Sequence, residues 1–479
     1  MSDPKVPLVV DLDGTLVRTD LMVESAIDLL ARRPSLLLAA LSSLLHGKAR
    51  FKEFLANGFV FDPSSLPFRS EVLSAIYSQR EAGGEVVLAT ASTETIGRRV
   101  ASALGLFSKV LTSTSSHNLS GSNKAQALVD LFGARGFDYV GDSSKDIAVW
   151  KASRMAYLVG DNQAARRAFN KLEGGIRLVE RDRMHTLLKW PKALRLHQWS
   201  KNFLVFVPGI AAHQILDPVI FLNLVLSFTT FGLVASAVYL INDVFDLQQD
   251  RTHPVKRSRP IANGDISVLK ASSASLALLV GAATVSSLLP AEFKQALLAY
   301  FLITTAYTLG LKRILMVDVV TLAGLYTLRI VAGGLAVGIS VSSWLLAFSF
   351  FIFLSLSFVK RSSELIQVSR DGAENVFGRA YKPVDLPVVN ALGVGAGLIS
   401  VLVFALYLDS PVVGNLYETS QVLWGGVPIL AFWISYFWVR AGRGEVDQDP
   451  VLFAIRDKVS LISGSLLLVI FLLAQTGLI

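Results

Sequence analysis

Two acidic residues separated by one leucine follow a short apolar run near the N-terminus. Asp11 and Asp13 lie in the sequence VVDLDGTL, residues 9–16. Carboxylates at positions i and i+2 just beyond a strand point the same way, so they can share a cation. One of them can then attack a phosphorus atom while the other handles the proton of the leaving group. The alternative for an isolated pair of this kind is a strand end with two solvated acids.

Three further polar elements follow in order along the chain. Thr90 ends the run EVVLAT, Lys124 lies in GSNKAQAL, and Asp142 and Asp146 lie in YVGDSSKD. A threonine hydroxyl can bind a phosphoryl oxygen, a lysine can neutralise charge on a phosphoryl group in transfer, and carboxylates are ligands for a hard divalent ion. Together with the first acidic pair, the ordered set favours a phosphoryl-transfer site over solvated acids.

These four elements resemble those of the haloacid dehalogenase superfamily of phosphohydrolases, over roughly residues 6–185. The resemblance implies that Asp11 is a nucleophile that forms an aspartyl-phosphate and that Asp13 is the general acid and base. The remaining roles that it implies are phosphate binding by Thr90 and Lys124, and Mg²⁺ binding by Asp11, Asp142 and the main-chain carbonyl of Asp13, with Asp146 as a supporting acid.

The spacing of apolar runs predicts the fold of this N-terminal part. Pro7–Val10, Glu85–Ala89, Tyr139–Val140 and Ala156–Val159 are expected strands, and helical stretches lie between them. That alternation is typical of a parallel α/β sheet. We therefore expect a Rossmann-like α/β domain with a helical cap at about residues 16–84.

Within the expected cap, the segment PSLLLAALSSLL, residues 34–45, is strongly apolar. It is too short to cross a bilayer, which takes about 20 residues. We interpret it as the core of the cap. The alternative is a surface that enters the membrane interface.

A second acidic cluster follows an apolar segment in the C-terminal half. Asp243, Asp246 and Asp250 are spaced i, i+3 and i+7, which would align them on one helical face. Acids that bind Mg²⁺ beside bases that bind phosphate suit a diphosphate substrate. The alternative is a salt-bridged loop at the membrane surface. The basic residues that follow directly are Arg251, His253, Lys256, Arg257 and Arg259.

This cluster resembles the UbiA-type intramembrane prenyltransferase superfamily, which implies an all-α domain of nine transmembrane helices around a polar cavity open to the cytoplasm. More of the chain is similar to one branch, the polyprenyl-phosphate phosphoribosyltransferases of cell-wall arabinan assembly. The matching segments are LHQWSKNFLVFVP (196–208), SAVYLINDVFDLQQDRTHPVKRSRPIANG (236–264), YTLGLKRILMVD (307–318), LRIVAGG (328–334), SSWLL (342–346) and VKRSSEL (359–365).

One departure from ordinary prenyltransferases supports that branch. Those enzymes carry a second aspartate-rich motif, whereas the corresponding place here offers Lys312, Arg313 and a single acid, Asp318. One metal-binding cluster with added cations suits a diphosphate-bearing sugar together with a metal-free lipid phosphate. Phosphoribosyl pyrophosphate and a polyprenyl phosphate match this description.

Several residues of the membrane half are candidates for substrate binding. Lys201 and Lys360 are suited to binding phosphate or to anchoring their segments at the membrane surface. Arg329 lies in an apolar run, where an unpaired charge is costly, so we expect it in a polar cavity. Tyr239 is either a site residue or an interface aromatic. The full candidate set is Lys201, Tyr239, Asn242, Arg251, Lys256, Arg259, Lys312, Arg329 and Lys360.

The composition requires that part of the chain lies in lipid. Hydrophobic residues make up 52% and charged residues 17%, against roughly 25% charged in a typical globular protein. The net charge of +8 is interpreted as cytoplasmic loops and phosphate-bearing substrates, not as a nucleic-acid surface. The cysteine count of 0 excludes a disulfide scaffold and fits a reducing compartment.

Nine apolar segments predict nine crossings of an inner (plasma) membrane. Basic residues on alternate connections place those loops in the cytoplasm by the positive-inside rule, and the C-terminus outside. The run Val6–Val10 is too short for the apolar part of a signal peptide, so the N-terminal domain is expected in the cytoplasm too. The expected crossings are Asn202–Leu216, Val219–Ile241, Leu269–Leu289, Phe293–Leu311, Ile314–Val337, Ser343–Val359, Val388–Leu408, Val422–Val439 and Val459–Leu478.

The sequence therefore predicts a phosphatase domain over residues 1–185, a basic linker over 186–200 and a membrane transferase domain over 201–479. The leading hypothesis is a bifunctional enzyme that uses Mg²⁺ in both domains. Its membrane half would transfer 5-phosphoribose from phosphoribosyl pyrophosphate to a polyprenyl phosphate, and its N-terminal domain would remove the 5-phosphate.

Two alternatives stay open at this point. The first is a prenyltransferase that moves a prenyl chain from its diphosphate to an aromatic or other acceptor. The second is a non-catalytic N-terminal module that docks or regulates the membrane enzyme. A homo-oligomer is compatible with each of these, and the sequence does not give the length of the lipid chain.

Overall fold

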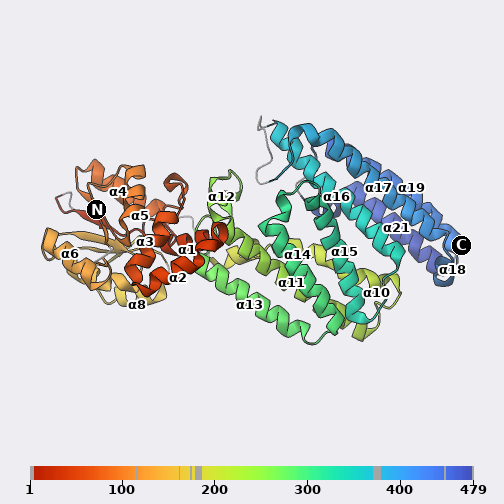
Figure 1. The fold of residues 1–479 in the computed structure, drawn as a ribbon, viewed down its shortest axis with the longest axis horizontal. Helices are drawn as coiled ribbons and strands as arrows, with labels where there is room; N and C mark the ends of the chain where they lie inside the picture. Colours follow the sequence, from red (N-terminus) through yellow and green to blue (C-terminus); the bar gives the residue numbers. More distant parts are fainter. Residues whose placement is uncertain are drawn as a thin grey trace. The chain divides into compact units, whose positions relative to one another are not determined.

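The chain folds into two compact units, coloured along the sequence in Figure 1. The computed structural model describes residues 5–114, 117–160, 162–172, 175–178, 186–370, 379–446 and 449–476. Unit 1 comprises Met1–Leu194 and Tyr239–Leu276, and unit 2 comprises Arg195–Val238 and Ala277–Ile479. The segment that carries the second acidic cluster thus packs with the N-terminal domain. The domain end expected at residue 185 lies outside the described residues.

A parallel sheet of six strands forms the centre of unit 1, in the order β3-β2-β1-β4-β5-β6. All neighbouring strands pair in parallel. The four expected strands are present as β1, β2, β4 and β5, and the two strands that the sequence did not predict, β3 and β6, lie at the edges. The bounds are β1 Leu8–Val10, β2 Val86–Thr93, β3 Lys109–Ser113, β4 Asp138–Gly141, β5 Ala156–Leu158 and β6 Ile176–Arg177.

Helices cover both faces of this sheet. Leu8 and Val10 of β1 belong to the core under α4 and α5, whereas Val9 belongs to the core under α6, α7 and α8, because neighbouring residues of a strand point to opposite faces. The strand order reverses at β1 and β4, and in such sheets ligands bind at the carboxyl ends of those strands. The helix bounds are α4 Ser70–Glu81, α5 Glu94–Leu104, α6 Ser122–Phe132, α7 Ile147–Ala152 and α8 Gln163–Phe169.

Three helices form the cap between β1 and α4. They are α1 (Leu21–Arg32), α2 (Leu37–Leu45) and α3 (Lys48–Gly58). The side chain of Asp20 caps α1 by accepting from the N–H groups at the start of that helix. A small core joins the three helices through Leu29, Ala40 and Leu55.

Three leucines of α2 do not form the core of the cap, so our interpretation of that segment was wrong for them. Leu38, Leu41 and Leu45 are 79%, 51% and 87% exposed. Ala40 is 1% exposed and supplies the buried contact of α2. Because the three leucines recur at helical spacing on the opposite side, they form one outward apolar face.

Seven helical segments among the described residues are long and apolar enough to cross a membrane, so the expectation of nine is corrected to seven. The segment Asn202–Leu216 instead contains the end of a 3₁₀ helix, η5 (Leu196–Phe206), and the short α10 (Val207–Ala211). Pro208 fits the first turn of α10 but not a helix interior, where its missing N–H and fixed φ would break the ladder. The seven are α11 Pro218–Phe245, α13 Val268–Ser286, α15 Val317–Val337, α16 Ser343–Arg370, Pro383–Leu408 with α17 at Leu386–Leu408, Ser420–Gly442 with α19 at Gly426–Gly442, and α21 Lys458–Thr476.

The second expected crossing that does not qualify is Phe293–Leu311. It forms a helix, α14 (Ala291–Leu309), but Glu292, Lys294 and Gln295 in its first turns lower its average apolarity. The remaining short helices are α9 Trp190–Ala193, α12 Leu247–Thr252, α18 Pro411–Leu416 and α20 Pro450–Arg456.

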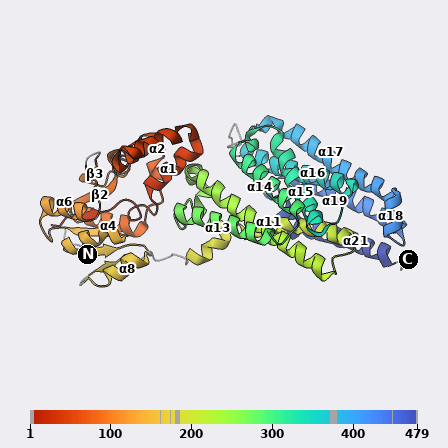
Figure 2. The same ribbon diagram turned by 60° about the horizontal axis from the view of Figure 1, so that its bottom comes forward.

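Within unit 2, α16 packs between α15 and α17, as Figure 2 shows. The 3₁₀ helix η5 also packs against α15. Gly333 of α15 allows this approach, because an added Cβ would lie 2.0 Å from the main-chain oxygen of Val205 in η5. One turn earlier in α15, the Arg329 Nε donates to Asn202 Oδ1 of η5 at 3.0 Å.

Replacement of Gly333 by alanine is expected to lower the melting temperature of the purified protein. The added methyl group meets main-chain atoms, which cannot rotate away, and overpacking of this kind costs about 1–3 kcal/mol. Gly324→Ala in the same helix is the matched control, because nothing lies within 4 Å of a Cβ at that position. Thermal unfolding in one detergent compares them, and equal melting temperatures would contradict the packing described.

Candidate active sites

The first acidic pair lies in a tight loop directly after β1. Gly14 in this loop has φ of +76°, and a Cβ there would lie 2.3 Å from the carboxylate of Asp142, which follows β4. The Thr15 hydroxyl donates to Asp142 Oδ1 at 3.3 Å. Glycine therefore serves two purposes here, since it adopts the left-handed conformation and lets the two loops meet.

Asp11 is paired with a buried lysine. Lys124 Nζ, in the first turn of α6, donates to Asp11 Oδ1 at 2.8 Å and to Tyr139 Oη at 3.1 Å. Burial alone would lower the pKa of Lys124, but the charges of Asp11 and Asp146 outweigh it and raise the pKa above its ordinary value. Burial raises the pKa of Asp11 to about 6, although Lys124 opposes the rise. The lysine thus keeps a positive charge beside the carboxylate, where a phosphoryl group would be stabilised.

Asp13 has different neighbours. Its Oδ1 accepts from the Leu21 N–H at 2.9 Å, and its Oδ2 accepts from the Ser92 hydroxyl at 2.6 Å. Burial, with the charge of Asp20 adding to it, raises the pKa of Asp13 to about 7. A carboxyl group with a pKa near neutrality can both give and take a proton, as acid–base catalysis requires.

Three carboxylates from the loops after β1 and β4 gather around one point. Asp11, Asp142 and Asp146 each offer an oxygen within 4.8 Å of the others. Burial, together with the charges of Asp11 and Asp146, raises the pKa of Asp142 to about 8. Asp146 is already engaged, because its oxygens accept from the Ser143 N–H at 3.0 Å and from Tyr139 Oη at 2.7 Å. A hard divalent cation fits this set, since its charge offsets the repulsion between the acids.

The structure brings the expected residues of this site to one edge of the sheet. Thr90 is fully buried, and its Oγ1 accepts from the Ser92 N–H at 3.0 Å. Sequence reasoning missed Ser92 as a partner of Asp13, and Tyr139 as a partner of the lysine. Ser92 lies two residues beyond Thr90, which is the only signal that could have found it, whereas a tyrosine inside a strand is most often a core residue.

The second acidic cluster spans the junction of two helices, across which the Asp246 N–H donates to the Asn242 carbonyl and the Asp250 N–H to the Asp246 carbonyl, each at 2.8 Å. Asp243 lies in the last turn of α11, the helix is interrupted at Asp246, and Asp250 lies in α12. Arg259 Nη1 donates to Asp243 Oδ1 at 3.0 Å and to Asp250 Oδ2 at 2.6 Å. Burial raises the pKa of Asp250 to about 6, although Arg259 opposes the rise. Two of the three acids therefore share one cation, the Arg259 guanidinium.

A buried ion pair joins this acidic loop to the cap of the N-terminal domain. Arg251 donates through Nη1 and Nη2 to the two carboxylate oxygens of Glu24, at 2.7 and 2.6 Å. Both side chains are almost fully buried. Glu24 also accepts from the Thr19 hydroxyl at 2.5 Å and the Gln248 amide at 3.1 Å, and Arg251 Nε donates to the Ala262 carbonyl at 3.1 Å. Arg251 is thus held in an internal pair instead of facing an open phosphate site.

A second group of contacts lies beside this pair. Asp265 forms ion pairs with Lys189 at 2.5 Å and with Arg18 at 3.8 Å. Gly264 has φ of +71°, and a Cβ there would lie 2.7 Å from Cβ of Arg18. The segment after the acidic cluster therefore rests directly on the loop that follows Asp13.

The expected cations of unit 2 occupy different surroundings. Arg329 donates to Tyr300 Oη at 2.8 Å and to the Leu325 carbonyl at 2.6 Å, in addition to Asn202. Lys201 pairs with Asp449 at 2.8 Å. Both are therefore held by contacts inside the unit, and neither lies unpaired in lipid.

Lys360, in the second half of α16, differs from these two. Within the part of the chain that the structure describes, its ammonium group forms no hydrogen bond or ion pair. Its neighbour Arg361 is buried and pairs with Asp318 and Glu364. The other candidates are placed as follows: Tyr239 and Asn242 on α11, Lys256 at the start of η6 (Lys256–Ser258), and Lys312 in η7 (Leu311–Arg313).

Asp318 is the single acid of the segment that we expected to correspond to the second acidic motif of ordinary prenyltransferases. It is fully buried and accepts from Tyr381 Oη at 2.7 Å. Arg361 and Arg379 approach it at 3.3 and 3.7 Å. The acid is thus neutralised within the fold, and no motif singled out Arg379 or Tyr381 in advance.

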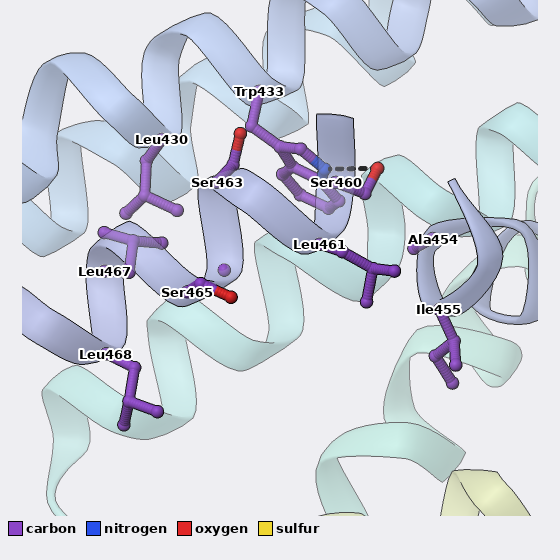
Figure 3. Close-up of a pocket in the computed structure, with 11 residues that line it drawn as sticks. Leu430, Trp433, Ala454, Ile455, Ser460, Leu461, Ser463, Ser465, Leu467 and Leu468 are labelled. Carbon is purple, nitrogen blue, oxygen red and sulfur yellow. Dashed lines mark hydrogen bonds between the residues drawn. The ribbon is translucent and has the colours of Figure 1, made fainter. Parts of the chain in front are cut away.

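An open apolar groove of about 450 Å³ lies between α19 and α21 (Figure 3). Its lining includes Leu430, Leu467 and Trp433, whose indole N–H donates to the Ser460 hydroxyl at 3.0 Å. Its lining contains no charged residue, and α20 completes it through Ala454 and Ile455, so the groove does not suit a phosphate.

The fold and sites define an integral membrane protein with a parallel α/β domain. The model of the UbiA prenyltransferase family matches residues 203–472, more than half of the chain. The chain therefore belongs to that family. It is accordingly an enzyme of the UbiA transferase class.

Three relatives are similar over different shares of the chain. The uncharacterized protein y4nM of Sinorhizobium fredii is 35% identical over 474 residues, 99% of this chain and 92% of that protein. The nodulation protein NoeC of Azorhizobium caulinodans is 35% identical over 281 residues, 57% of this chain and 88% of that protein. The decaprenyl-phosphate phosphoribosyltransferase of Mycobacterium tuberculosis is 37% identical over 274 residues, 56% of this chain and 88% of that protein.

Removal of one member of the Glu24–Arg251 pair is expected to destabilise the protein strongly. Glu24→Gln leaves a buried guanidinium without its counter-charge, at a cost of about 3–5 kcal/mol. The double variant Glu24→Gln, Arg251→Met should lose less than the sum of the two single variants, because no uncompensated charge remains. Thermal unfolding of the four proteins measures the coupling.

The exposed pair Glu94–Arg98 of α5, at 2.6 Å, provides the control. Glu94→Gln should cost about 0–1 kcal/mol, as is usual for surface pairs. If the stability losses at Glu24 and Arg251 are additive, or if Glu24→Gln and Glu94→Gln cost the same stability, the buried pair does not stabilise the protein more than a surface pair does.

Proposed function

We propose that this protein is a bifunctional membrane enzyme. Its membrane domain transfers 5-phosphoribose from phosphoribosyl pyrophosphate to a polyprenyl phosphate and releases pyrophosphate. Its N-terminal domain then hydrolyses the 5-phosphate of the lipid-linked product. Mg²⁺ serves both reactions, and both sites face the cytoplasm.

Support for the hydrolytic step comes from the buried Asp11–Lys124 pair beside Asp142. A carboxylate, a fixed ammonium charge and a crowded acid set at the carboxyl edge of a parallel sheet suit attack on a phosphate monoester. Mg²⁺ held by Asp11 and Asp142 would draw charge from the phosphoryl oxygens. Thr90 and Lys124 bind those oxygens and hold phosphorus in line with the attacking carboxylate.

The hydrolytic reaction balances in two steps. The Asp11 carboxylate forms a bond to phosphorus as the ester P–O bond breaks, and Asp13 gives its proton to the departing ribose oxygen. Asp13 then takes a proton from water, whose oxygen bonds to phosphorus while the Asp11–phosphorus bond breaks. The products are the ribose lipid and inorganic phosphate, and both carboxyl groups return to their starting states. The raised pKa of Asp13 suits it to this double role.

Support for phosphoribosyl transfer comes from the family membership and from the relatives named for that reaction. Asp243 and Asp250 both accept from the Arg259 guanidinium, so their carboxylates lie close enough together for one cation, which supports the proposal. In the reaction, Mg²⁺ on the acidic loop and the adjacent bases Lys256 and Arg259 would stabilise the departing pyrophosphate. The bond from the anomeric carbon to pyrophosphate breaks, and a phosphate oxygen of the lipid forms the new bond.

Lys360 is our choice for the group that holds the lipid phosphate. An ammonium group without a hydrogen-bonding partner among the described residues, on a membrane-spanning helix, is costly unless an anion joins it. A phosphate monoester supplies that anion. Arg361 is less suited, because Asp318 and Glu364 already pair with it.

Purified protein with labelled phosphoribosyl pyrophosphate, polyprenyl phosphate and Mg²⁺ is expected to yield a labelled lipid. Asp243→Asn and Lys360→Gln should each lower the rate by about 10²–10³-fold, as loss of a group that stabilises transition-state charge usually does. Lys294→Gln, at an exposed lysine of α14, is the control. If a product forms only from a prenyl diphosphate and an aromatic acceptor, the proposed phosphoribosyl transfer is wrong and the enzyme is a prenyltransferase.

Replacement of Asp11 by asparagine is expected to change the product and not the transfer itself. The lipid that carries 5-phosphoribose should accumulate, and the dephosphorylated ribose lipid should be lost, because the nucleophile is absent. Asp130→Asn, at an exposed acid of α6, is the control. Mass spectrometry of the lipids with time provides the readout. An unchanged ratio of the two lipids in the Asp11→Asn protein would show that the N-terminal domain does not hydrolyse this lipid.

A further inference from the structure

The outward face of α2 is the largest unexplained feature of the N-terminal domain. Leu38, Leu41 and Leu45 lie at helical spacing and are 79%, 51% and 87% exposed. Leu44, beside them, is 44% exposed. Contiguous apolar patches of this kind are rare on soluble surfaces and mark sites of interaction.

The segment that contains α2 is basic. Arg33 and Arg50, which flank α2 in the sequence, are exposed, and the sequence contains no acidic residue between them. An apolar face bordered by cations matches the boundary between anionic headgroups and acyl chains. A second copy of the same face would bring arginine against arginine, which disfavours self-association.

We propose that α2 is a membrane-surface helix that inserts its leucines into the interface of the bilayer in which the chain is anchored. At nine residues it cannot cross, so it lies along the surface, with Ala40 toward the cap and the leucines toward lipid. The partner is the lipid bilayer itself, with a preference for anionic headgroups. The same chain contains helices that are long and apolar enough to cross a membrane, so a bilayer is part of its surroundings.

This contact gives the cap a role in substrate access, a point that rests on the proposed function. The cap helix α1 is tied to the catalytic loop, because the Leu21 N–H donates to Asp13 Oδ1. The same helix packs with α2 through Leu29 and Ala40. A cap that rests on the bilayer would hold the Asp11 site close to the headgroup layer, where a lipid-linked phosphate is displayed.

The chain contains 0 cysteines, so a single cysteine can carry a fluorescent label in the full-length protein without other changes. We would label Leu41→Cys, with Leu131→Cys as the control, since Leu131 is 45% exposed on α6 of the same domain. In nanodiscs of phosphatidylcholine with phosphatidylglycerol, a lipid-borne nitroxide should quench the label at position 41 and not at 131. Quenching should weaken in pure phosphatidylcholine.

Equal quenching at the two positions in both kinds of nanodisc would overturn the proposal. So would protection of position 41 that appears in lipid-free amphipol and rises with protein concentration, because a second copy would then cover the face. Neither readout requires the enzyme to act on any substrate, so failure of the proposed function leaves this test intact.

A second variant tests the consequence for activity. Leu38→Ser combined with Leu45→Ser should slow hydrolysis of a lipid-linked phosphate several-fold and leave hydrolysis of soluble p-nitrophenyl phosphate unchanged. Leu131→Ser should alter neither rate. Loss of both activities in the double variant would indicate a folding defect and overturn the assignment of a membrane role to these leucines. An unchanged rate on the lipid substrate would overturn the role in access.

Discussion

The buried pair of Glu24 and Arg251 is the interaction on which both candidate sites depend. Two charges removed from water are tolerated only when geometry and hydrogen bonds are complete, and here Thr19 and Gln248 complete the shell of the glutamate. The glutamate lies on the helix whose first N–H group holds Asp13. The arginine directly follows the last acid of the second cluster. One ion pair therefore joins the helix that holds Asp13 to the segment that carries the second acidic cluster.

The repulsion between neighbouring carboxylates is offset differently in the two acidic clusters. After β1 and β4, the carboxylates crowd together and their pKa values rise, so the cluster gains stability when a divalent cation arrives. Beside α11, a guanidinium already spans Asp243 and Asp250. The repulsion among the acids is therefore left for a cation to offset in the first cluster, whereas Arg259 already offsets it in the second.

The sequence predicted that Asp11 and Asp142 lie close together, because both directly follow strands. Residues that follow neighbouring parallel strands meet at the carboxyl edge of the sheet. Glu24 and Arg251 are separated by 227 positions in the sequence, so no local sequence pattern could have predicted that they form a pair. The crossing expected at Asn202–Leu216 was wrong for a related reason, since apolarity does not distinguish an α-helix from a 3₁₀ segment that packs against a neighbour.

The close approach at Gly264 has a consequence for how this fusion can change over generations. Loss of the N-terminal domain would expose a glycine in a left-handed conformation and leave Arg251 without Glu24 and Asp265 without Arg18. The phosphoribosyltransferase relatives match only the membrane half, so single-domain relatives exist. In this chain, however, separation of the two parts would leave a buried arginine without its counter-charge, which is costly unless the arginine is replaced as well.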